Sequence, residues 1–254
     1  MTHAVLLACT LVRTYAGPCA LSSASGFFFR HAGQVHLVTC RHVLQDLPAG
    51  HLPDRIEIDI HEQPQDLGVI RTLSLPLYRH GRPGWRAGQD RAGPVDVATL
   101  AIDPALWNGR DGPACFTVAH LQGTLAEVGV GEPVLIIGFP MGFHDQRHHL
   151  PVARQASIAS AFGVRFQGLG QFLTDARTHR GSSGSPVVLR DPSGDPRLPW
   201  KLLGVHSARL DMLPRDTVQD EALGLNCAWY ADVLPGLIES APFAGVRTEW
   251  PWVP

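Results

Sequence analysis

The stretch RGSSGSPVV, residues 180–188, carries the strongest functional signal in the sequence. Acyl transfer needs a hydroxyl on a tight turn, with backbone N–H groups converging beside it. Gly181 permits the unusual backbone angles that such a turn demands. We therefore expect Ser183 to be a nucleophile and the amides of Gly181 and Ser183 to form an oxyanion hole. A plain Ser/Gly turn is the alternative. A GxSxG nucleophile elbow does not fit, because Ser185 stands where that motif has glycine.

Two further apolar strings contain residues that could activate this serine. LVTCRHVL contains His42 where a predicted strand runs into a turn, and VDVATLAI contains Asp96 at the start of another. A serine hydroxyl is inert at neutral pH unless a base takes its proton, and histidine is the natural base. A buried carboxylate is costly unless it is paired, and orienting a histidine would satisfy it. In the alternative reading, His42 is a packing residue and Asp96 an ordinary turn residue, with Asp90 and Asp103 as competitors.

The composition indicates a β-rich globular protein. The 254 residues are 44% hydrophobic and 17% charged, and they include 26 glycines and 21 prolines, which favours many turns over a helix bundle. A net charge of −2 argues against a nucleic-acid partner. No run approaches the ~20 apolar residues of a membrane helix, so no membrane partner is expected.

Short apolar or alternating runs bounded by turn residues predict strands along most of the chain. The first run lacks a preceding basic flank, which favours a strand over a signal peptide. Residues 232–240 predict a short C-terminal helix, which Pro235 limits to a start or a kink. The predicted strands are residues 4–12, 26–30, 35–39, 55–60, 69–75, 97–102, 134–139, 155–159, 170–174, 186–189, 202–205 and 223–229.

The cysteines favour a reducing compartment. Their number is odd and their positions are scattered, which indicates reduced thiols and not a disulfide framework. We therefore predict a cytoplasmic protein, with secretion or a periplasmic location less favoured. The five are Cys9, Cys19, Cys40, Cys115 and Cys227.

Taken together, the three strings resemble the conserved blocks of the chymotrypsin-fold (trypsin-like) serine peptidases. VTCRHV resembles that family's TAAHC or TNAHV block, VDVATL its DIALL block, and RGSSGSP its GDSGGP or GNSGGP block. VLIIGFP, RQASIAS and LLGVHS resemble strands of its second barrel, so the resemblance extends from about residue 20 to 238. It is most similar to the stand-alone bacterial branch, which includes glutamyl endopeptidases and the protease domains of HtrA proteins.

The resemblance implies an all-β fold of two packed six-stranded antiparallel β-barrels with a short C-terminal helix. Residues 1–118 would form the barrel that carries His42 and Asp96. Residues 119–254 would form the barrel that carries Ser183, together with the helix and the tail.

Two departures from the family concern its control. Val43 follows His42 where secreted animal enzymes carry a disulfide cysteine, and Ser182 stands where zymogen-activated members carry an aspartate. Activation through that ion pair is therefore not expected. Control by a regulatory protein partner or by loop ordering remains open.

The resemblance also places residues in a primary specificity pocket. These are Thr178, five residues before the nucleophile, and His206, Ser207 and Arg209 of the substrate strand. A Thr/His pair resembles the glutamyl endopeptidases and the glutamine-preferring viral 3C-type proteases. Such N–H and O–H donors suit an acidic or amide side chain, and Arg177 and Arg209 could add positive charge. We predict cleavage after Glu, with Asp or Gln next; alternatively, His206 packs under the triad and the pocket is small and apolar.

Two other features are weaker signals. His144, Asp145, His148 and His149 cluster in one loop, but the four-ligand pattern of a zinc site is incomplete. We therefore expect no metal and no other cofactor. The tail TEWPWVP is expected to pack onto the barrel or to dock a partner.

The function classes that remain open are an enzyme and a binding module. The first is a serine endopeptidase that forms an acyl-enzyme on protein or peptide substrates, processing a specific partner in a bacterial regulatory or defence pathway. The second is a catalytically inactive binding module with a vestigial triad, and an esterase on the same triad is a third possibility. All three triad residues and the glycines are present, which favours the enzyme; fold alone would not.

Overall fold

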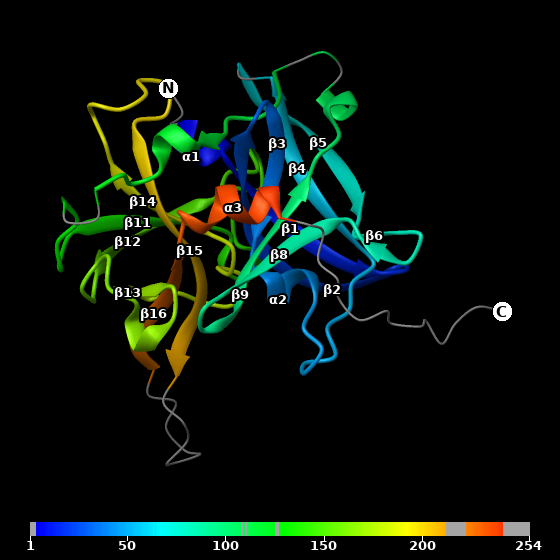
Figure 1. Ribbon diagram of the computed structural model, residues 1–254. Helices are drawn as coiled ribbons and strands as arrows, with labels where there is room; N and C mark the ends of the chain where they lie inside the picture. The colour runs from blue at the N-terminus through cyan, green and yellow to red at the C-terminus, as the bar shows by residue number, and fades with distance from the viewer. Residues whose placement is uncertain are drawn as a thin grey trace.

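A computed structural model of the chain describes residues 4–240, apart from residues 64, 108, 110, 125–126 and 212–221 (Figure 1). The tail TEWPWVP therefore lies outside the described residues. The helices are α1 (Ala4–Leu7), α2 (Arg41–Leu44) and α3 (Val233–Glu239), and 3-10 turns are found at Pro104–Trp107, Val118–His120, Pro140–Gly142 and Phe166–Gly168. None of the helices described is long and apolar enough to cross a membrane.

The first half of the chain folds into an eight-stranded sheet. Its path runs β5-β4-β1-β2-β3-β9-β8, and β10 pairs in parallel with β2. A separate two-stranded hairpin, β6 (Tyr78–Arg79) and β7 (Arg82–Pro83), follows β5. The strands of the sheet are β1 (Cys9–Ala16), β2 (Cys19–His31), β3 (Gln34–Thr39), β4 (Arg55–Gln63), β5 (Asp66–Pro76), β8 (Trp85–Asp90), β9 (Gly93–Ala101) and β10 (Phe116–Thr117).

The second half folds into a closed antiparallel barrel with the order β11-β12-β13-β16-β15-β14. Because the barrel is closed, none of its six described strands is an edge strand. Its strands are β11 (Pro133–Gly138), β12 (Val152–Ile158), β13 (Gln171–Asp175), β14 (Pro186–Arg190), β15 (Trp200–Asp211) and β16 (Ala222–Tyr230).

The expected fold class is confirmed: the protein is mostly β, with two packed barrel-like sheets and a short C-terminal helix. The second barrel has the expected six strands. The first sheet differs, because it contains more strands than expected and its edge strands β5 and β8 do not pair with each other in the described part. The expected boundary between residues 118 and 119 lies between β10, in the first sheet, and β11, in the barrel.

Each predicted strand overlaps an observed one. The run at residues 4–12 begins with the helical turn α1, and its strand starts only at Cys9. Four observed strands, β6, β7, β8 and β10, lie outside the predicted runs. β8 is the longest of them and lies in a Gly/Arg-rich segment. Its Trp85 and Ala87 are buried, and both pair with β9. Long-range pairing therefore formed a strand that local composition did not indicate.

The larger of two hydrophobic clusters spans both halves, and a second cluster lies within the barrel. Phe27, Phe28 and Phe29 on β2 are all almost fully buried. Since neighbouring strand residues face opposite sides, both faces of β2 are covered. The same buried cluster continues into the barrel through Ile137 and Val205.

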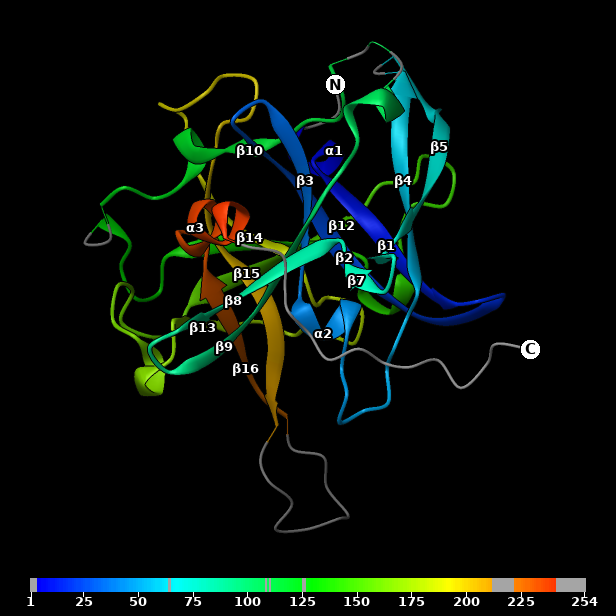
Figure 2. The same cartoon turned by 45° about the vertical axis from the view of Figure 1, so that its right-hand side comes forward.

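Helix α3 seals the junction of the two halves. Figures 1 and 2 both show it between the sheets, where it contacts β8 and β9 of the first sheet. Leu234, Leu237 and Ile238 are its buried residues. Pro235 falls in the first turn, where the missing N–H of proline leaves no hydrogen bond unmade.

Candidate active site

His42 and Asp96 form a doubly hydrogen-bonded pair. β3 and β9 are neighbouring strands, and they bring α2, which carries His42, against Asp96 on β9. The His42 Nδ1–H donates to Asp96 Oδ2 at 2.7 Å, and the His42 backbone N–H donates to Asp96 Oδ1 at 2.9 Å. With Nδ1 engaged, the ring orientation is fixed and Nε2 is left for another group.

The pair shifts both pKa values toward the charged forms. Burial alone lowers the pKa of His42, but the hydrogen bond and charge of Asp96 outweigh it, so the pKa is raised above 6.5. Burial alone raises the pKa of Asp96, but the hydrogen bond and charge of His42 outweigh that effect and the pKa is lowered. His42 is therefore a better proton acceptor than an ordinary histidine, and Asp96 stays ionised.

Ser207 connects this pair to the serine loop. Its hydroxyl donates to Asp96 Oδ2 at 2.6 Å, and its backbone carbonyl accepts the Ser183 hydroxyl at 3.0 Å. The family resemblance implied that Ser207 lines the substrate pocket. In the structure, its side chain supports Asp96 and its carbonyl lies beside the serine.

The loop that carries Ser183 leaves two backbone donors unused. The amides of residues 182, 184 and 185 all donate to backbone carbonyls. Those of Gly181 and Ser183 donate to no atom of the residues that the structure describes. Gly181 has φ +88°, and a Cβ there would lie 2.7 Å from Phe139 O, so only glycine fits.

Ser25, on β2 of the first sheet, hydrogen-bonds to the loop that carries Ser183. Its role was not predicted from the sequence. Its backbone N–H donates to Ser183 O at 2.9 Å and its hydroxyl donates to Gly181 O at 2.8 Å. The same hydroxyl accepts the Phe139 N–H at 2.9 Å. Approach is so close that a Cβ on Gly184 would lie 2.1 Å from Ser25 O. One fully buried serine thus ties both halves of the molecule to the loop.

A cavity of about 530 Å³ lies next to this loop, and it gathers three of the predicted pocket residues, Arg177, Thr178 and Arg209. The Thr178 hydroxyl donates to Asn226 Oδ1, so its proton is already engaged inside the protein. Thr178 itself is buried. The arginines are therefore the lining groups that bring positive charge to a ligand.

The cavity wall carries more positive than negative charge. Its lining also contains His179 and Asp175. The pKa of His179 is lowered, first by burial and then by the charges of Arg154, Arg177 and Arg209. The guanidinium groups therefore act together at this wall, and an anionic group would offset their repulsion.

His206 does not line this cavity. It is 2% exposed, its Nδ1 has no hydrogen-bond partner, and the pKa is lowered to about 4 by burial and by the charge of His42. Its carbonyl accepts the Cys40 thiol at 3.2 Å and the Gly184 N–H at 2.8 Å. This histidine thus lies neutral beneath the His42–Asp96 pair.

The comparison with protein families decides the assignment. Residues 24–194 match the family model described as "Trypsin-like peptidase domain". The chain belongs to the trypsin-like peptidase family. No curated protein matches the sequence.

Solved structures of proteases and of an inactivated protease paralogue share the fold of this peptidase domain. The serine endoprotease from Yersinia pestis superposes with a TM-score of 0.57 at 16% identity, over 92% of this chain and 62% of that one. The active form of the Rv3671c protease from M. tuberculosis gives 0.53 at 17% identity, over 94% and 85%. An inactivated protease paralogue of the scabies mite gives 0.56 at 18% identity, over 93% and 95%. This chain thus spans less than two thirds of the Yersinia protein, and identities this low show the fold alone.

The loop histidines of the peptidase domain are engaged separately. His148 Nδ1–H donates to Asp145 at 2.7 Å, and His144 Nδ1–H donates to Gly142 O at 2.6 Å. His149 Nδ1 lies 3.9 Å from Asp59 Oδ2 on β4. Within the described ranges, the only three-residue set with metal-ligand spacing is Cys40, His42 and Asp96.

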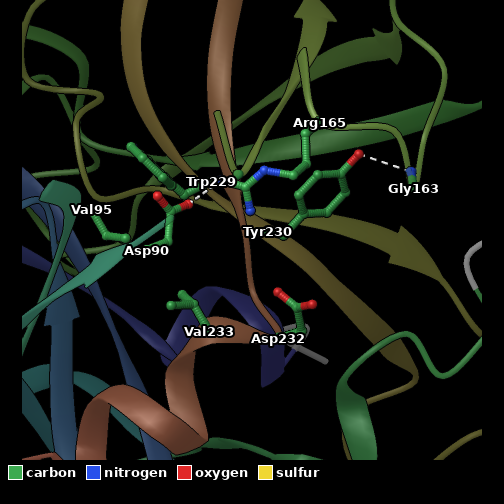
Figure 3. A pocket seen from close by; sticks show the side chains of 9 residues that line it. Asp90, Val95, Gly163, Arg165, Trp229, Tyr230, Asp232 and Val233 are labelled. Atoms are coloured by element: carbon green, nitrogen blue, oxygen red, sulfur yellow. Dashed lines mark hydrogen bonds and ion pairs between the residues drawn. The ribbon is translucent and has the colours of Figure 1, made fainter. Parts of the chain in front are cut away.

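A second cavity, of about 270 Å³, lies between the β8–β9 hairpin and the barrel (Figure 3). Val95, the neighbour of Asp96, lines it. Arg165 and Asp90 form an ion pair at 2.5 Å across it, joining the β8–β9 hairpin to the barrel. Figure 3 shows the Asp232 carboxylate on the opposite side of the cavity from Arg165. The ion pair is therefore a further connection between the two halves of the peptidase domain.

Proposed function

We propose that the chain is an active serine endopeptidase with Ser183, His42 and Asp96 as its triad. The observation that carries the proposal is the 2.7 Å bond from His42 Nδ1–H to Asp96, which leaves Nε2 free to act as a base. His42 takes the Ser183 proton as the serine attacks the scissile carbonyl, and Asp96 stabilises the imidazolium. The unused amides of Gly181 and Ser183 hold the oxyanion. His42 gives the Ser183 proton to the leaving amine as the C–N bond breaks, and water then hydrolyses the acyl-enzyme to free Ser183.

The attack requires one side-chain rotation. The Ser183 hydroxyl donates to the Ser207 carbonyl, and it must turn toward His42 to transfer its proton. A serine rotamer change of this kind occurs in picoseconds to nanoseconds for an accessible side chain. The bond to Ser207 is therefore compatible with turnover.

A fluorophosphonate probe tests the proposal, because it labels only an activated serine. We expect one label per chain, on Ser183, and its loss in Ser183→Ala and in His42→Ala. Ser193→Ala, which changes an exposed serine on another loop, is the matched control and keeps the label. Labelling that survives both triad substitutions contradicts the proposal. Ester and peptide substrates assayed in parallel separate an endopeptidase from an esterase.

We further propose cleavage after Glu, with Asp or Gln next. The support is the positive cavity wall at Arg177 and Arg209, with Asp175 as its opposing acid. A carboxylate receives charge-assisted hydrogen bonds from guanidinium groups, which an arginine or lysine side chain of a substrate could not receive. A peptide library is the test, and Arg209→Gln should lower the Glu preference about 10-fold, in line with the loss of a charge-assisted hydrogen bond. Preferred cleavage after Arg, Lys or a large aromatic residue would contradict the proposed preference for Glu.

A catalytically inactive binding module is the second candidate. Two observations favour it: the Ser183 hydroxyl donates to Ser207 and not to His42, and an inactivated protease paralogue has the same fold. In that case neither the probe nor peptide hydrolysis would depend on Ser183 or His42.

For its biological role, we propose processing of a specific protein partner in the cytoplasm, in a bacterial regulatory or defence pathway. The five cysteines are unpaired, which suits a reducing compartment. Purified protein should cleave casein poorly and cut one protein encoded nearby at a single site. Broad casein degradation, or recovery of the protein from the medium, would contradict this role.

A further inference from the structure

Two large apolar side chains stand exposed on one loop beside the active site. Met141 and Phe143 are 72% and 69% exposed, among the most exposed large hydrophobic residues of the described chain. They follow β11, in the 3-10 turn Pro140–Gly142 and immediately after it. Single exposed apolar residues scattered over a surface need no explanation. Met141 and Phe143, however, are separated by one residue only and lie beside the candidate active site.

The backbone of the loop fixes their exposure. The Gly142 N–H donates to Phe139 O at 2.9 Å, and the Phe143 N–H donates to Pro140 O at 2.8 Å. Met141 has φ +53°, in the left-handed region that non-glycine residues rarely adopt. A side chain held outward at a conformational cost points to a function at that position.

The loop lies directly against the oxyanion-hole segment. The Met141 N–H donates to Arg180 O at 2.6 Å, and a Cβ on Gly181 would lie 2.7 Å from the same nitrogen. A Cβ on Gly142 would lie 3.4 Å from Ser23 of β2. No residue of this loop lines the arginine cavity, which is formed by residues 175–179, 209–210 and 224–226.

In the proposed mechanism, a peptide cut at Ser183 places its carbonyl oxygen at the Gly181 and Ser183 amides. The Met141 loop lies against Gly181 and outside the arginine cavity. It is therefore placed to contact a part of the substrate that the arginine cavity does not hold.

We infer that Met141 and Phe143 bind a large apolar side chain of the substrate, one or two residues after the cut. This inference rests on the proposed endopeptidase activity and deepens it. The substrate is thus a protein segment with an acidic residue before the cut and an apolar residue after it. Burying that side chain against two exposed apolar groups removes apolar surface from water on both partners. Requiring both features narrows cleavage to few sites per protein.

Two peptides that differ only in the two residues after the cut test the inference. Both carry, before the cut, the residue that the library selects; after it, one carries leucine at the first and second positions and the other carries serine. We expect kcat/KM to be about 10-fold higher for the leucine peptide, the size of discrimination that an apolar contact gives. Phe143→Ser and Met141→Asn should each reduce this ratio toward one. Asparagine is chosen to replace Met141 because it tolerates the left-handed backbone conformation of that residue.

Val130→Ser is the matched control. Val130 is equally exposed, at 69%, but it precedes β11 whereas Met141 follows it, so the two lie at opposite ends of the strand. The control should keep the wild-type ratio. Thermal melts of all three variants should stay close to wild type, since surface substitutions change stability little.

The outcomes separate this inference from the proposed function. If the probe labels Ser183 but wild type cleaves both peptides equally, the endopeptidase stands and the apolar contact is wrong. A ratio that survives both loop variants also overturns the contact. If neither peptide is cut and Ser183 is not labelled, both proposals fail together.

Discussion

The first sheet supplies the proposed triad with its two ionisable side chains, whereas the closed barrel supplies the Ser183 hydroxyl and the backbone groups around it. His42 and Asp96 meet through one hydrogen bond between their side chains and one from the His42 backbone N–H, and both depend on the Asp96 carboxylate. The barrel contributes the amides of Gly181 and Ser183 and the carbonyl of Ser207. Side-chain parts can therefore be replaced without moving the chain. Backbone parts can be altered only by changing the fold around them, which predicts different stability costs for the two halves.

The largest effect is expected for Asp96→Asn. The amide keeps the shape of the side chain but cannot fix the His42 tautomer or stabilise its charge, so kcat should fall about 10⁴-fold. The unfolding midpoint should move little. Asp103→Asn, an exposed carboxylate just beyond the same strand, should leave both unchanged. Activity within ten-fold of wild type in Asp96→Asn would contradict the role of the pair.

A substitution in the backbone half should lower activity and stability together. Gly181→Ala forces a Cβ to within 2.7 Å of both Phe139 O and Met141 N, at φ +88°. We expect a loss of about 10²- to 10³-fold in kcat, as for a lost oxyanion donor, together with a lowered melting temperature. Gly33→Ala is the control, because Gly33 has φ +81° but no atom within 4 Å of the added Cβ. It should lose only a little stability, of order 1 kcal/mol, and no activity; equal effects at both sites would remove the argument from close approach.

Ser25 joins the two halves and should give an intermediate result. Ser25→Ala removes the bond to Gly181 O and leaves the Phe139 N–H without its acceptor. A buried donor without a partner costs about 1–3 kcal/mol, and we expect kcat to fall about 10-fold with KM nearly constant. Ser22→Ala, an exposed serine on the same strand, tests whether any serine of β2 matters. A fall in stability with kcat unchanged would make Ser25 purely structural.

Short local strings were enough to predict the pairing of His42 with Asp96, whereas the catalytic roles of these residues and of Ser183 stay predictions. The strings around His42, Asp96 and Ser183 are short and local, and the structure brings the first two into direct contact. The apolar runs likewise predicted most strands, because alternation and β-branched residues are local signals.

What the sequence did not indicate depends on contacts between distant segments. Ser25 is one of three serines in SSAS, and nothing local distinguishes the buried one that holds the oxyanion loop. β8 was not predicted because its segment is rich in glycine and arginine. The spacing of the apolar Trp85 and Ala87, two residues apart, is a weak sequence signal for this strand. The pocket role of His206 was implied by the family resemblance, whereas its burial near His42 depends on how the two halves pack.

The smallest expected effect separates two histidines. Both His42 and His206 lose solvation on burial, but only His42 has a carboxylate partner. In an inactive Ser183→Ala background, an NMR titration should show His42 titrating above 6.5 and His206 near 4. Because His42 must be neutral to act as a base, kcat/KM of the wild type should fall as pH drops through the raised pKa of His42.

Asp96→Asn in the same Ser183→Ala background should move only one of the two curves. Without the carboxylate, burial dominates at His42, so its pKa should fall below the ordinary value, while His206 still titrates near 4. If both curves move together, the charge of the first sheet reaches the barrel as strongly as it reaches its own histidine. The division between a side-chain half and a backbone half would then be wrong.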